Sequence, residues 1–179
     1  MNFIIKFLVI LSLYMSTSKF ANSNIYDLNF LGIDGKKILL EKFKNKPLII
    51  VNTASLCGFT YQYEELENLF KKFKSQGLTI IGIPSNNFGN QELENEKKVK
   101  EFCDLNFNIT FPLTTITDVK GKKRHPFFSW VYEKGGAIST PKWNFYKYLI
   151  DKQGNLSSWF SSVTSPSSKK FITAVKKIL

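Results

Sequence analysis

Cys57 is the residue of this chain best placed to act as a nucleophile, because it lies in a turn between a predicted strand and a predicted helix. The apolar run at residues 48–51 is rich in β-branched side chains, which is typical of a buried strand. From about Tyr61 onward, leucine and phenylalanine recur at helical spacing with charged residues between them. Unpaired N–H groups and the positive end of the helix dipole lie at such a helix start, and they favour the reactive thiolate.

Two further segments carry polar side chains that could serve a thiolate. The segment PSNNFGNQE, with Asn87, follows a predicted strand, and PKWNF carries Trp143 and Asn144. Loops at the carboxyl ends of parallel strands gather at one edge of an α/β sheet. An indole N–H and side-chain amides brought there would donate hydrogen bonds to a sulfur anion or a peroxide oxygen. The alternatives are that Trp143 is a core anchor, that Asn87 is an ordinary turn residue, and that Gln91 belongs only to the loop.

The remaining pattern alternates strands with helices and predicts an α/β fold with a central mixed sheet flanked by helices. Strands are predicted at residues 48–51, 78–83 and 111–119, and hairpins at 25–40 and 145–160, the first turning at Asp34-Gly35 and the second between Asp151 and Gly154. Helices are predicted over residues 61–74, 95–107, 125–136 and 165–179. Pro126 is expected to begin the third of these helices, and Ser165 to cap the last one with Pro166 at its first position.

Composition narrows the classes of function. The chain has 179 residues, 43% of them hydrophobic, which suits one domain of ordinary size at residues 23–179. Its net charge of +11 comes mainly from scattered lysines, and the one tight basic cluster is Lys120, Lys122, Lys123 and Arg124. This pattern argues against nucleic-acid binding and favours an acidic protein partner or anionic lipid headgroups. Two cysteines and one histidine are too few for a dedicated Cys/His metal site, and no cofactor is expected.

The first 22 residues have the layout of a secretory signal peptide. One early lysine, Lys6, precedes a mostly apolar run from Phe7 to Met15, and small polar residues follow. The alternative is an uncleaved signal anchor, and the chain is cytoplasmic if the segment is not used. The glycosylation sequons at Asn108 and Asn155 matter only in a secretory pathway that glycosylates.

Three segments in this order, NTASLCG, PSNNFG and PKWNF, resemble the signature segments of the glutathione peroxidase family, from about Ile25 to the C-terminus. The resemblance implies a thioredoxin-like fold, with an extra N-terminal hairpin, and reduction of hydrogen peroxide and organic or lipid hydroperoxides. Cys57 matches the peroxidatic position, and Trp143 and Asn144 match the indole and amide donors. Asn87 stands where the family has glutamine, one methylene longer, so a bridging water would have to restore its contact with the sulfur.

Cys103 resembles the resolving cysteine of the family branch that thioredoxin-type proteins reduce. The implied cycle takes Cys57 to a sulfenic acid, closes a Cys57–Cys103 disulfide and reopens it by thiol exchange. The short stretch between Asp118 and Pro141 resembles the monomeric branch, which accepts bulky lipid hydroperoxides.

Other readings stay open. The two cysteines could form a permanent structural disulfide, glutathione could be the reductant, or the protein could be a redox sensor that passes oxidation to a partner. A non-catalytic binding protein is a further alternative. Thr60 stands where a C-x-x-C oxidoreductase needs its second cysteine, which argues against a disulfide isomerase.

Overall fold

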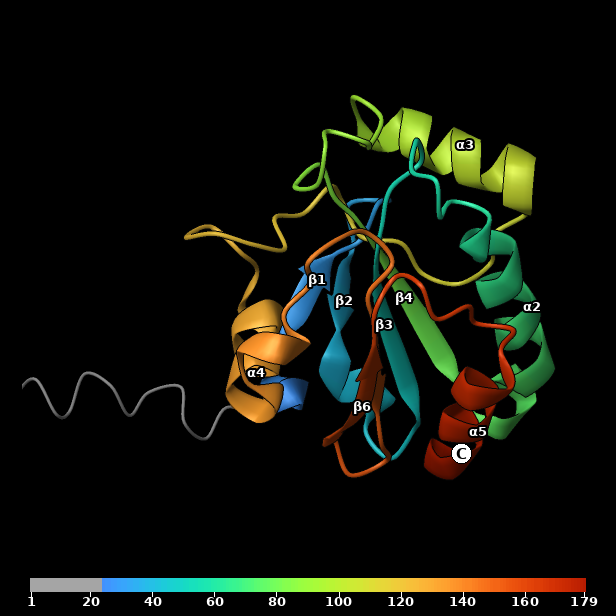
Figure 1. Cartoon of the computed structure of the whole chain (residues 1–179), viewed down its shortest axis with the longest axis vertical. Coiled ribbons are helices and arrows are strands. Elements are labelled where there is room, and N and C mark those ends of the chain that lie inside the picture. Colours follow the sequence, from blue (N-terminus) through green and yellow to red (C-terminus); the bar gives the residue numbers. More distant parts are fainter. Residues whose placement is uncertain (1–23) are drawn as a thin grey trace, which may run out of the picture.

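The computed structural model describes residues 24–179, so the predicted signal segment lies outside the described residues. Its centre is a sheet of β3 (Leu48–Thr53), β4 (Thr79–Pro84), β5 (Lys147–Ile150) and β6 (Leu156–Phe160), in the order β4-β3-β5-β6 (Figure 1). Strands β3 and β4 run parallel, whereas β5 is antiparallel to both of its neighbours. The predicted mixed sheet is therefore confirmed.

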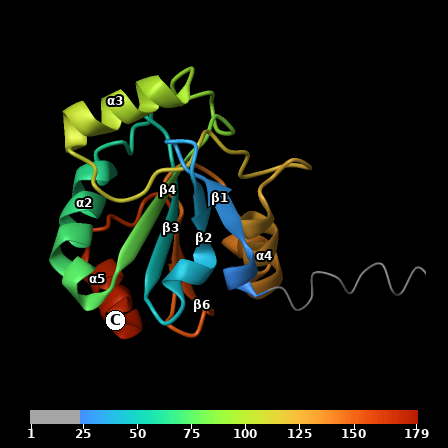
Figure 2. The ribbon, with the colours of Figure 1, turned by 180° about the vertical axis from the view of Figure 1, so that it is seen from behind.

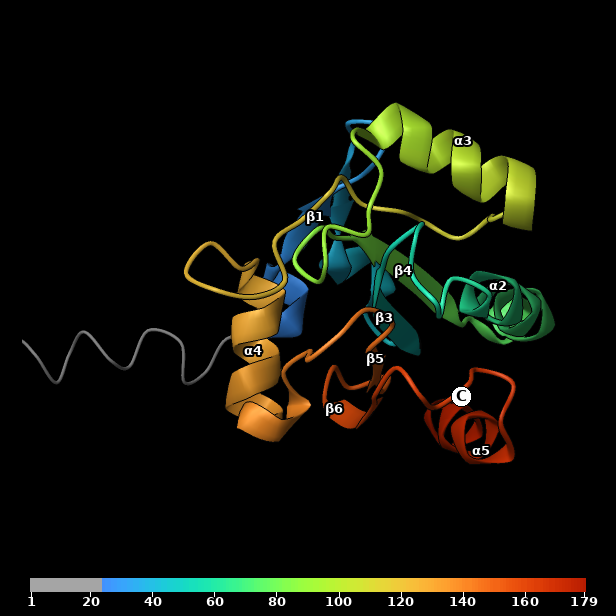
Figure 3. The same ribbon diagram turned by 45° about the horizontal axis from the view of Figure 1, so that its top comes forward.

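Helices cover both faces of this sheet. Figure 3 shows α2 (Gln62–Phe73) and α5 (Lys169–Ile178) on one side and α4 (Pro126–Gly135) on the other. The predicted N-terminal hairpin is present as β1 (Asn29–Leu31) paired with β2 (Lys37–Leu39), on the side of α4 (Figure 2). Helix α3 (Glu96–Phe107) lies across the end of the sheet at the top of Figure 1. The short 3₁₀ turns are η1 (Ile25–Asp27), η2 (Leu40–Phe43), η3 (Lys74–Gln76) and η4 (Ala137–Ser139).

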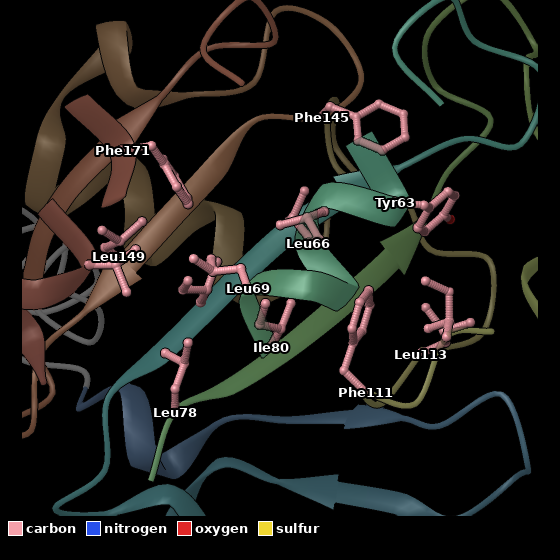
Figure 4. Packing of buried hydrophobic residues seen from close by; sticks show 14 of the residues in the cluster. Tyr63, Leu66, Leu69, Leu78, Ile80, Phe111, Leu113, Phe145, Leu149 and Phe171 are labelled. Atoms are coloured by element: carbon pink, nitrogen blue, oxygen red, sulfur yellow. The ribbon is translucent and has the colours of Figure 1, made fainter. Parts of the chain in front are cut away.

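Side-chain alternation along the strands divides the core into two layers. In β3, Ile49 and Val51 join the cluster under α2 and α5, whereas Leu48 and Ile50 join the cluster under α4. This is why the apolar run has no polar interruptions: both faces of the strand are covered. Figure 4 shows Leu66 and Leu69 of α2 packing onto the sheet, with aromatic side chains of the same cluster around them.

The predicted start is correct for one helix and wrong for another. His125 caps α4, because its Nδ1 accepts the N–H of Phe127 at 3.2 Å while its ring stacks on Phe30. This confirms the predicted start of α4. The predicted start of α5 is wrong, because Ser168, not Ser165, caps that helix by accepting the N–H of Phe171. Ser165 instead donates its hydroxyl to the carboxylate of Glu65 at 2.9 Å.

The strand predicted at residues 111–119 is also wrong. Only isolated bridges form there, between Leu113 and Gly82 and between Thr114 and Gly32. Pro112 has no N–H to donate, and the N–H groups of Thr115 and Thr117 bond to two different strands, at Leu31 and Pro84. The approach at Gly82 is so close that a Cβ there would lie 2.6 Å from Leu113.

Two features are absent from residues 24–179. No helix in this range is long and apolar enough to cross a bilayer. The same range contains no group of three or more histidine, cysteine, aspartate or glutamate side chains arranged to hold a metal ion.

Candidate active site

Cys57 lies in the turn that joins β3 to α2, as the sequence predicts. Its backbone N–H donates to Thr60 Oγ1 at 3.0 Å, which holds the turn closed. The sulfur accepts the N–H of Phe59 at 3.5 Å, a bond that is stronger when the acceptor is a thiolate. Helix α2 begins only at Gln62, so the donor to the sulfur comes from the turn itself. Cys57 is 8% exposed, and the neighbouring Leu56 is 60% exposed.

The Trp143–Asn144 segment is clamped to β3 by the fully buried Asn52. The side-chain amide of Asn52 donates to the carbonyl of Trp143 at 3.0 Å, and its Oδ1 accepts the N–H of Tyr146 at 3.0 Å. The N–H of Phe145 donates to the Asn52 carbonyl at 2.6 Å. Phe145 is buried and has a φ of 62°, a left-handed conformation that is costly for a bulky side chain. The loop therefore has a fixed, strained backbone next to the strand that leads to Cys57.

Trp143 and Asn144 also contact the second polar segment. Trp143 is 39% exposed, and the centroid of its ring lies 5.9 Å from that of Phe88. Asn144 is fully buried, and its Nδ2 donates to Gln91 Oε1 at 3.0 Å. Asn144 Oδ1 is buried without a hydrogen-bond partner among the described residues. The structure thus brings the second and third segments together, but through Phe88 and Gln91.

The hydrogen bonds of Asn87 run to another loop. Its Nδ2 donates to Asp118 Oδ1 at 2.7 Å, and its Oδ1 accepts the N–H of Val119 at 2.6 Å and of Lys120 at 3.1 Å. These three bonds account for its amide oxygen and one of its two N–H donors. Within residues 24–179, Asn87 makes no hydrogen bond to Cys57, Trp143 or Asn144.

Two residues join the Cys57 turn to this segment: Gln91, which sequence reasoning weighed as an ordinary loop residue, and Glu92, which it missed. The N–H of Leu56 donates to the Gln91 carbonyl at 2.8 Å, and the N–H of Ser55 donates to Glu92 Oε1 at 3.1 Å. Burial raises the pKa of Glu92, although the hydrogen bonds from Ser55 and from the Leu93 N–H oppose the shift. The available signal was that both residues belong to the same polar loop as Asn87.

Cys103 lies in the middle of α3 and points into the core. It is fully buried, and burial raises the pKa of its thiol to about 12. Helix α3 buries only one other side chain completely, that of Val99. Cys57 and Cys103 are both free thiols in this structure.

Comparison with known proteins places this geometry in a family. The model of the family described as glutathione peroxidase matches residues 25–132. The chain belongs to the glutathione peroxidase family. Family membership makes it an oxidoreductase of the peroxidase class, and the resemblance drawn from the three sequence segments is confirmed.

The similar curated proteins cover most of the chain. A glutathione peroxidase of Lactococcus lactis is 39% identical, over 87% of this chain and 99% of the relative. The glutathione peroxidase-like peroxiredoxin HYR1 of Saccharomyces cerevisiae is 42% identical, over 82% of this chain and 91% of the relative. The hydroperoxy fatty acid reductase gpx1 of Synechocystis is 38% identical, over 82% of this chain and 91% of the relative.

Solved structures confirm the fold. The apo form of Trgpx superposes with a TM-score of 0.67 at 30% identity, covering 86% of this chain and 96% of that chain. The GPX1 of T. cruzi superposes with a TM-score of 0.67 at 31% identity, covering 87% of this chain and 94% of that chain. A thioredoxin-family thiol:disulfide interchange protein of Chlorobium tepidum, at 22% identity and a TM-score of 0.63, shares the fold over 84% of this chain and 92% of that chain. The predicted thioredoxin-like fold is therefore confirmed.

Proposed function

We propose that this glutathione peroxidase homologue reduces hydroperoxides with Cys57 as the peroxidatic residue. The observation that carries the proposal is the Cys57 sulfur, which accepts the Phe59 N–H in a turn tied to the loop of Asn144. In the first step the thiolate attacks one peroxide oxygen, so that an S–O bond forms and the O–O bond breaks. The second oxygen leaves as an alkoxide or hydroxide and takes a proton, giving alcohol or water. Trp143 and Asn144 are the donors that we assign to the reacting oxygens.

Cys103 is the resolving residue in this proposal. Its sulfur attacks the Cys57 sulfenic acid, an S–S bond forms, the S–O bond breaks and water leaves. The buried thiol, with its pKa raised to about 12, must first reach a less apolar environment and lose its proton. Only two side chains of α3 are completely buried, those of Val99 and Cys103, and this supports a local shift of that helix.

The reductant that we propose is a dithiol protein of the thioredoxin type, with glutathione as the less favoured alternative. A second cysteine gives the enzyme an internal disulfide as its resting oxidised form, and a dithiol protein can reopen such a bond by exchange. Three of the similar curated proteins carry the name peroxiredoxin, which supports this choice. The short segment between Asp118 and Pro141 resembles that of the monomeric branch of the family, so we propose a monomer.

A basic pocket beside Trp143 supports contact with membrane lipid or fatty-acid hydroperoxides. It has a volume of about 390 Å³ and is lined by Lys120, Arg124 and Lys142 together with Phe88. The ammonium of Lys120 lies 4.6 Å from the centroid of the Phe88 ring. If the carboxylate or phosphate of a lipid bound to these cations, the apolar chain of that lipid would lie next to the indole of Trp143. The name hydroperoxy fatty acid reductase, given to one relative, points to the same substrate class.

The first 22 residues lie outside the described part of the chain, and we propose that they act as a signal for the secretory pathway. In that case the enzyme protects a lumenal or extracellular compartment against oxidative stress.

The test is NADPH-coupled consumption of peroxide by the full chain, with thioredoxin and its reductase in one assay and glutathione and its reductase in another. We expect turnover with thioredoxin, little turnover with glutathione, and loss of activity in Cys57→Ser and Cys103→Ser. The same assays are repeated with fatty-acid hydroperoxides, with phospholipid hydroperoxides and with hydrogen peroxide. The rates obtained rank these substrates.

Three outcomes would contradict parts of this proposal. Turnover with glutathione that survives Cys103→Ser would overturn the reductant and the resolving role. Rapid oxidation of Cys57 without turnover in either assay would favour a sensor that hands its oxidation to a partner. An unreactive Cys57 would overturn the peroxidatic assignment.

A further inference from the structure

The chain that ends α3 lies against one face of α2. Tyr63, Glu67 and Phe70 are spaced along α2 so that they share one face of that helix. The ring centroid of Tyr63 lies 5.4 Å from that of Phe107, and the ring centroid of Phe70 lies 6.1 Å from that of Phe111. Glu67 stands between these two aromatic contacts and supplies the polar contact of the same face.

Glu67 holds Thr110 with both oxygens of its carboxylate. It accepts the Thr110 N–H on Oε2 at 2.9 Å and the Thr110 hydroxyl on Oε1 at 2.6 Å. The ammonium of Lys71, one turn further along α2, lies 3.3 Å from Oε1. Glu67 is only 2% exposed, so its carboxylate depends on these partners. Among the described residues, no other side chain forms a hydrogen bond with residues 108–111.

Thr110 is directly connected to the hydrogen bonds that end α3. Asn108 ends the helix with a φ of 49°, in the left-handed conformation typical of this position. The N–H of the buried Ile109 then donates to the Cys103 carbonyl at 3.3 Å. Unwinding of α3 at Cys103 breaks this bond and displaces Ile109, and the bonds from Glu67 to the next residue restrain that displacement.

We propose that Glu67 is a positioning residue for Cys103, which holds the end of α3 on α2 and thereby sets the rate at which Cys103 resolves the Cys57 sulfenic acid. While the bonds to Thr110 are closed, Cys103 stays buried in the core. When they open, the last turns of α3 can unwind and the sulfur can leave the core. Helix α2 is the fixed partner, because it buries six side chains. This inference rests on the proposed function, in which Cys103 attacks that sulfenic acid.

The test compares Glu67→Met with the wild type after a single turnover with hydrogen peroxide. Rapid-quench alkylation follows two steps separately, the oxidation of Cys57 and the closure of the disulfide. Methionine has a similar length but cannot accept the Thr110 bonds. We expect disulfide closure to become about tenfold faster, the effect of losing one hydrogen bond to a charged group. Oxidation of Cys57 should keep the wild-type rate, because the bonds of Glu67 do not reach the Cys57 turn.

Glu65→Met is the matched control. Glu65 lies on the same helix and accepts two hydroxyl bonds of 2.9 Å, from Ser165 and Ser167, in a segment without a cysteine. This variant should close the disulfide at the wild-type rate. Glu67→Gln, which keeps a carbonyl acceptor for the Thr110 N–H, should resolve more slowly than Glu67→Met. If Glu65→Met is accelerated as much as Glu67→Met, general loosening of α2 explains the effect and the specific role of Glu67 is overturned.

Thr110→Val tests the same contact from the other side. Valine keeps the shape of the side chain and the backbone N–H bond but loses the hydroxyl bond to Glu67. We expect disulfide closure to become about threefold faster, as for the loss of one ordinary hydrogen bond. A wild-type or slower rate of closure in Thr110→Val would overturn the proposal, also where Glu67→Met fails to fold.

Hydrogen exchange of the reduced protein separates this proposal from the proposed function. The amides of residues 104–110 should exchange faster in Glu67→Met than in the wild type, whether or not the protein reduces peroxide. If they do so but Cys103→Ser leaves the oxidised product unchanged, the resolving role fails and the kinetic role of Glu67 falls with it. If the wild type closes the disulfide and these amides are equally protected in Glu67→Met, the proposed function stands and the role of Glu67 is overturned.

Discussion

Asn52 shows how one buried amide can determine the geometry of the candidate active site. Its side chain satisfies two backbone groups in or next to the Trp143–Asn144 loop, the Trp143 carbonyl and the Tyr146 N–H, while it sits inside a fully buried strand. A buried polar side chain in β3 needs these partners, because an unpaired amide in the core costs free energy. Its bonds also hold Phe145 in the left-handed conformation that gives the loop its shape.

Replacing Asn52 by leucine should therefore damage both stability and chemistry. The substitution leaves the Trp143 carbonyl and the Tyr146 N–H without their partner, which should lower the free energy of unfolding by about 1–3 kcal/mol per buried group. Urea denaturation measures this loss, and stopped-flow oxidation of Cys57 should slow in parallel. Asn106→Leu, on an exposed position of α3, is the control. Equal stability of Asn52→Leu and wild type would contradict the assignment.

The two thiols should differ strongly in reactivity in the reduced protein. Because burial raises the pKa of Cys103 to about 12, this thiol stays protonated and shielded at pH 8. We expect iodoacetamide to label Cys57 at least about tenfold faster than Cys103, since the thiolate is the reacting form. Peptide mass spectrometry after timed quenching measures both rates. Equally rapid labelling of both cysteines in the folded protein would show that Cys103 is not held as the structure has it.

Helix α3 is the element that must move if Cys103 is to reach Cys57. Only Val99 and Cys103 are completely buried among its residues, whereas α2 buries six side chains. An element with few buried contacts opens at lower free energy than its neighbours. Hydrogen exchange should accordingly be faster in α3 than in α2.

Val99→Ala tests this directly. Removing two buried methyl groups weakens the packing of α3 by about 1 kcal/mol or more. If opening of α3 limits disulfide formation, the rate at which the Cys57 sulfenic acid is resolved should rise about fivefold. Rapid-quench alkylation measures that rate, and Lys97→Ala, on the exposed face, is the control. A slower or unchanged resolution step in Val99→Ala would contradict a role for α3 opening.

At the scale of elements, the sequence predicted those helices, strands and turns whose formation depends on the local pattern of residues. The buried strand before Cys57, the hairpin at Asp34-Gly35 and the helix that begins at Pro126 each follow from their own residues. The segment at residues 111–119 has strand composition, but its N–H groups bond to Leu31 and Pro84, which are distant in sequence. Such tertiary competition is invisible in a local pattern.

The difference between local pattern and tertiary contacts also applies to the candidate site. Motif spacing predicts Cys57, Trp143 and Asn144 as site residues, because those residue types are unusual in their positions. The direction of an amide is set by tertiary hydrogen bonds, so the turn of Asn87 towards Asp118 and of Gln91 towards Asn144 could not be read from spacing. The catalytic role of Asn87 stays a prediction.

At the scale of the whole molecule, a buried lysine links stability to pH. Lys147 is fully buried in β5, and its Nζ donates to Gln62 Oε1 and to the Thr164 carbonyl, both at 2.7 Å. Burial lowers its pKa to about 7, and the charge of Glu65 opposes the shift. In the unfolded chain, the Lys147 ammonium keeps its proton up to the ordinary pKa range of lysine. Between pH 7 and 10 the unfolded chain therefore binds more protons at this residue than the folded protein does. Stability from this group therefore rises with pH.

Lys147→Met removes this titration. We expect the free energy of unfolding of the wild type, measured against that of Lys147→Met in urea, to increase from pH 7 to pH 9.5, by at most a few kcal/mol. The difference between the two proteins cancels the titration of groups that they share, such as Cys103. A difference that stays constant or falls with pH would mean that the Lys147 ammonium keeps its proton in the folded state.

The most direct test of the whole account is the intact mass of the full chain after one equivalent of hydrogen peroxide, with and without alkylation. If Cys57 is oxidised and Cys103 resolves it, the mass falls by about 2 Da and neither cysteine alkylates, whereas Cys103→Ser gains about 16 Da as a sulfenic acid. A wild type that keeps both thiols, or that gains oxygen on Cys57 without closing the disulfide, would contradict the two-cysteine mechanism.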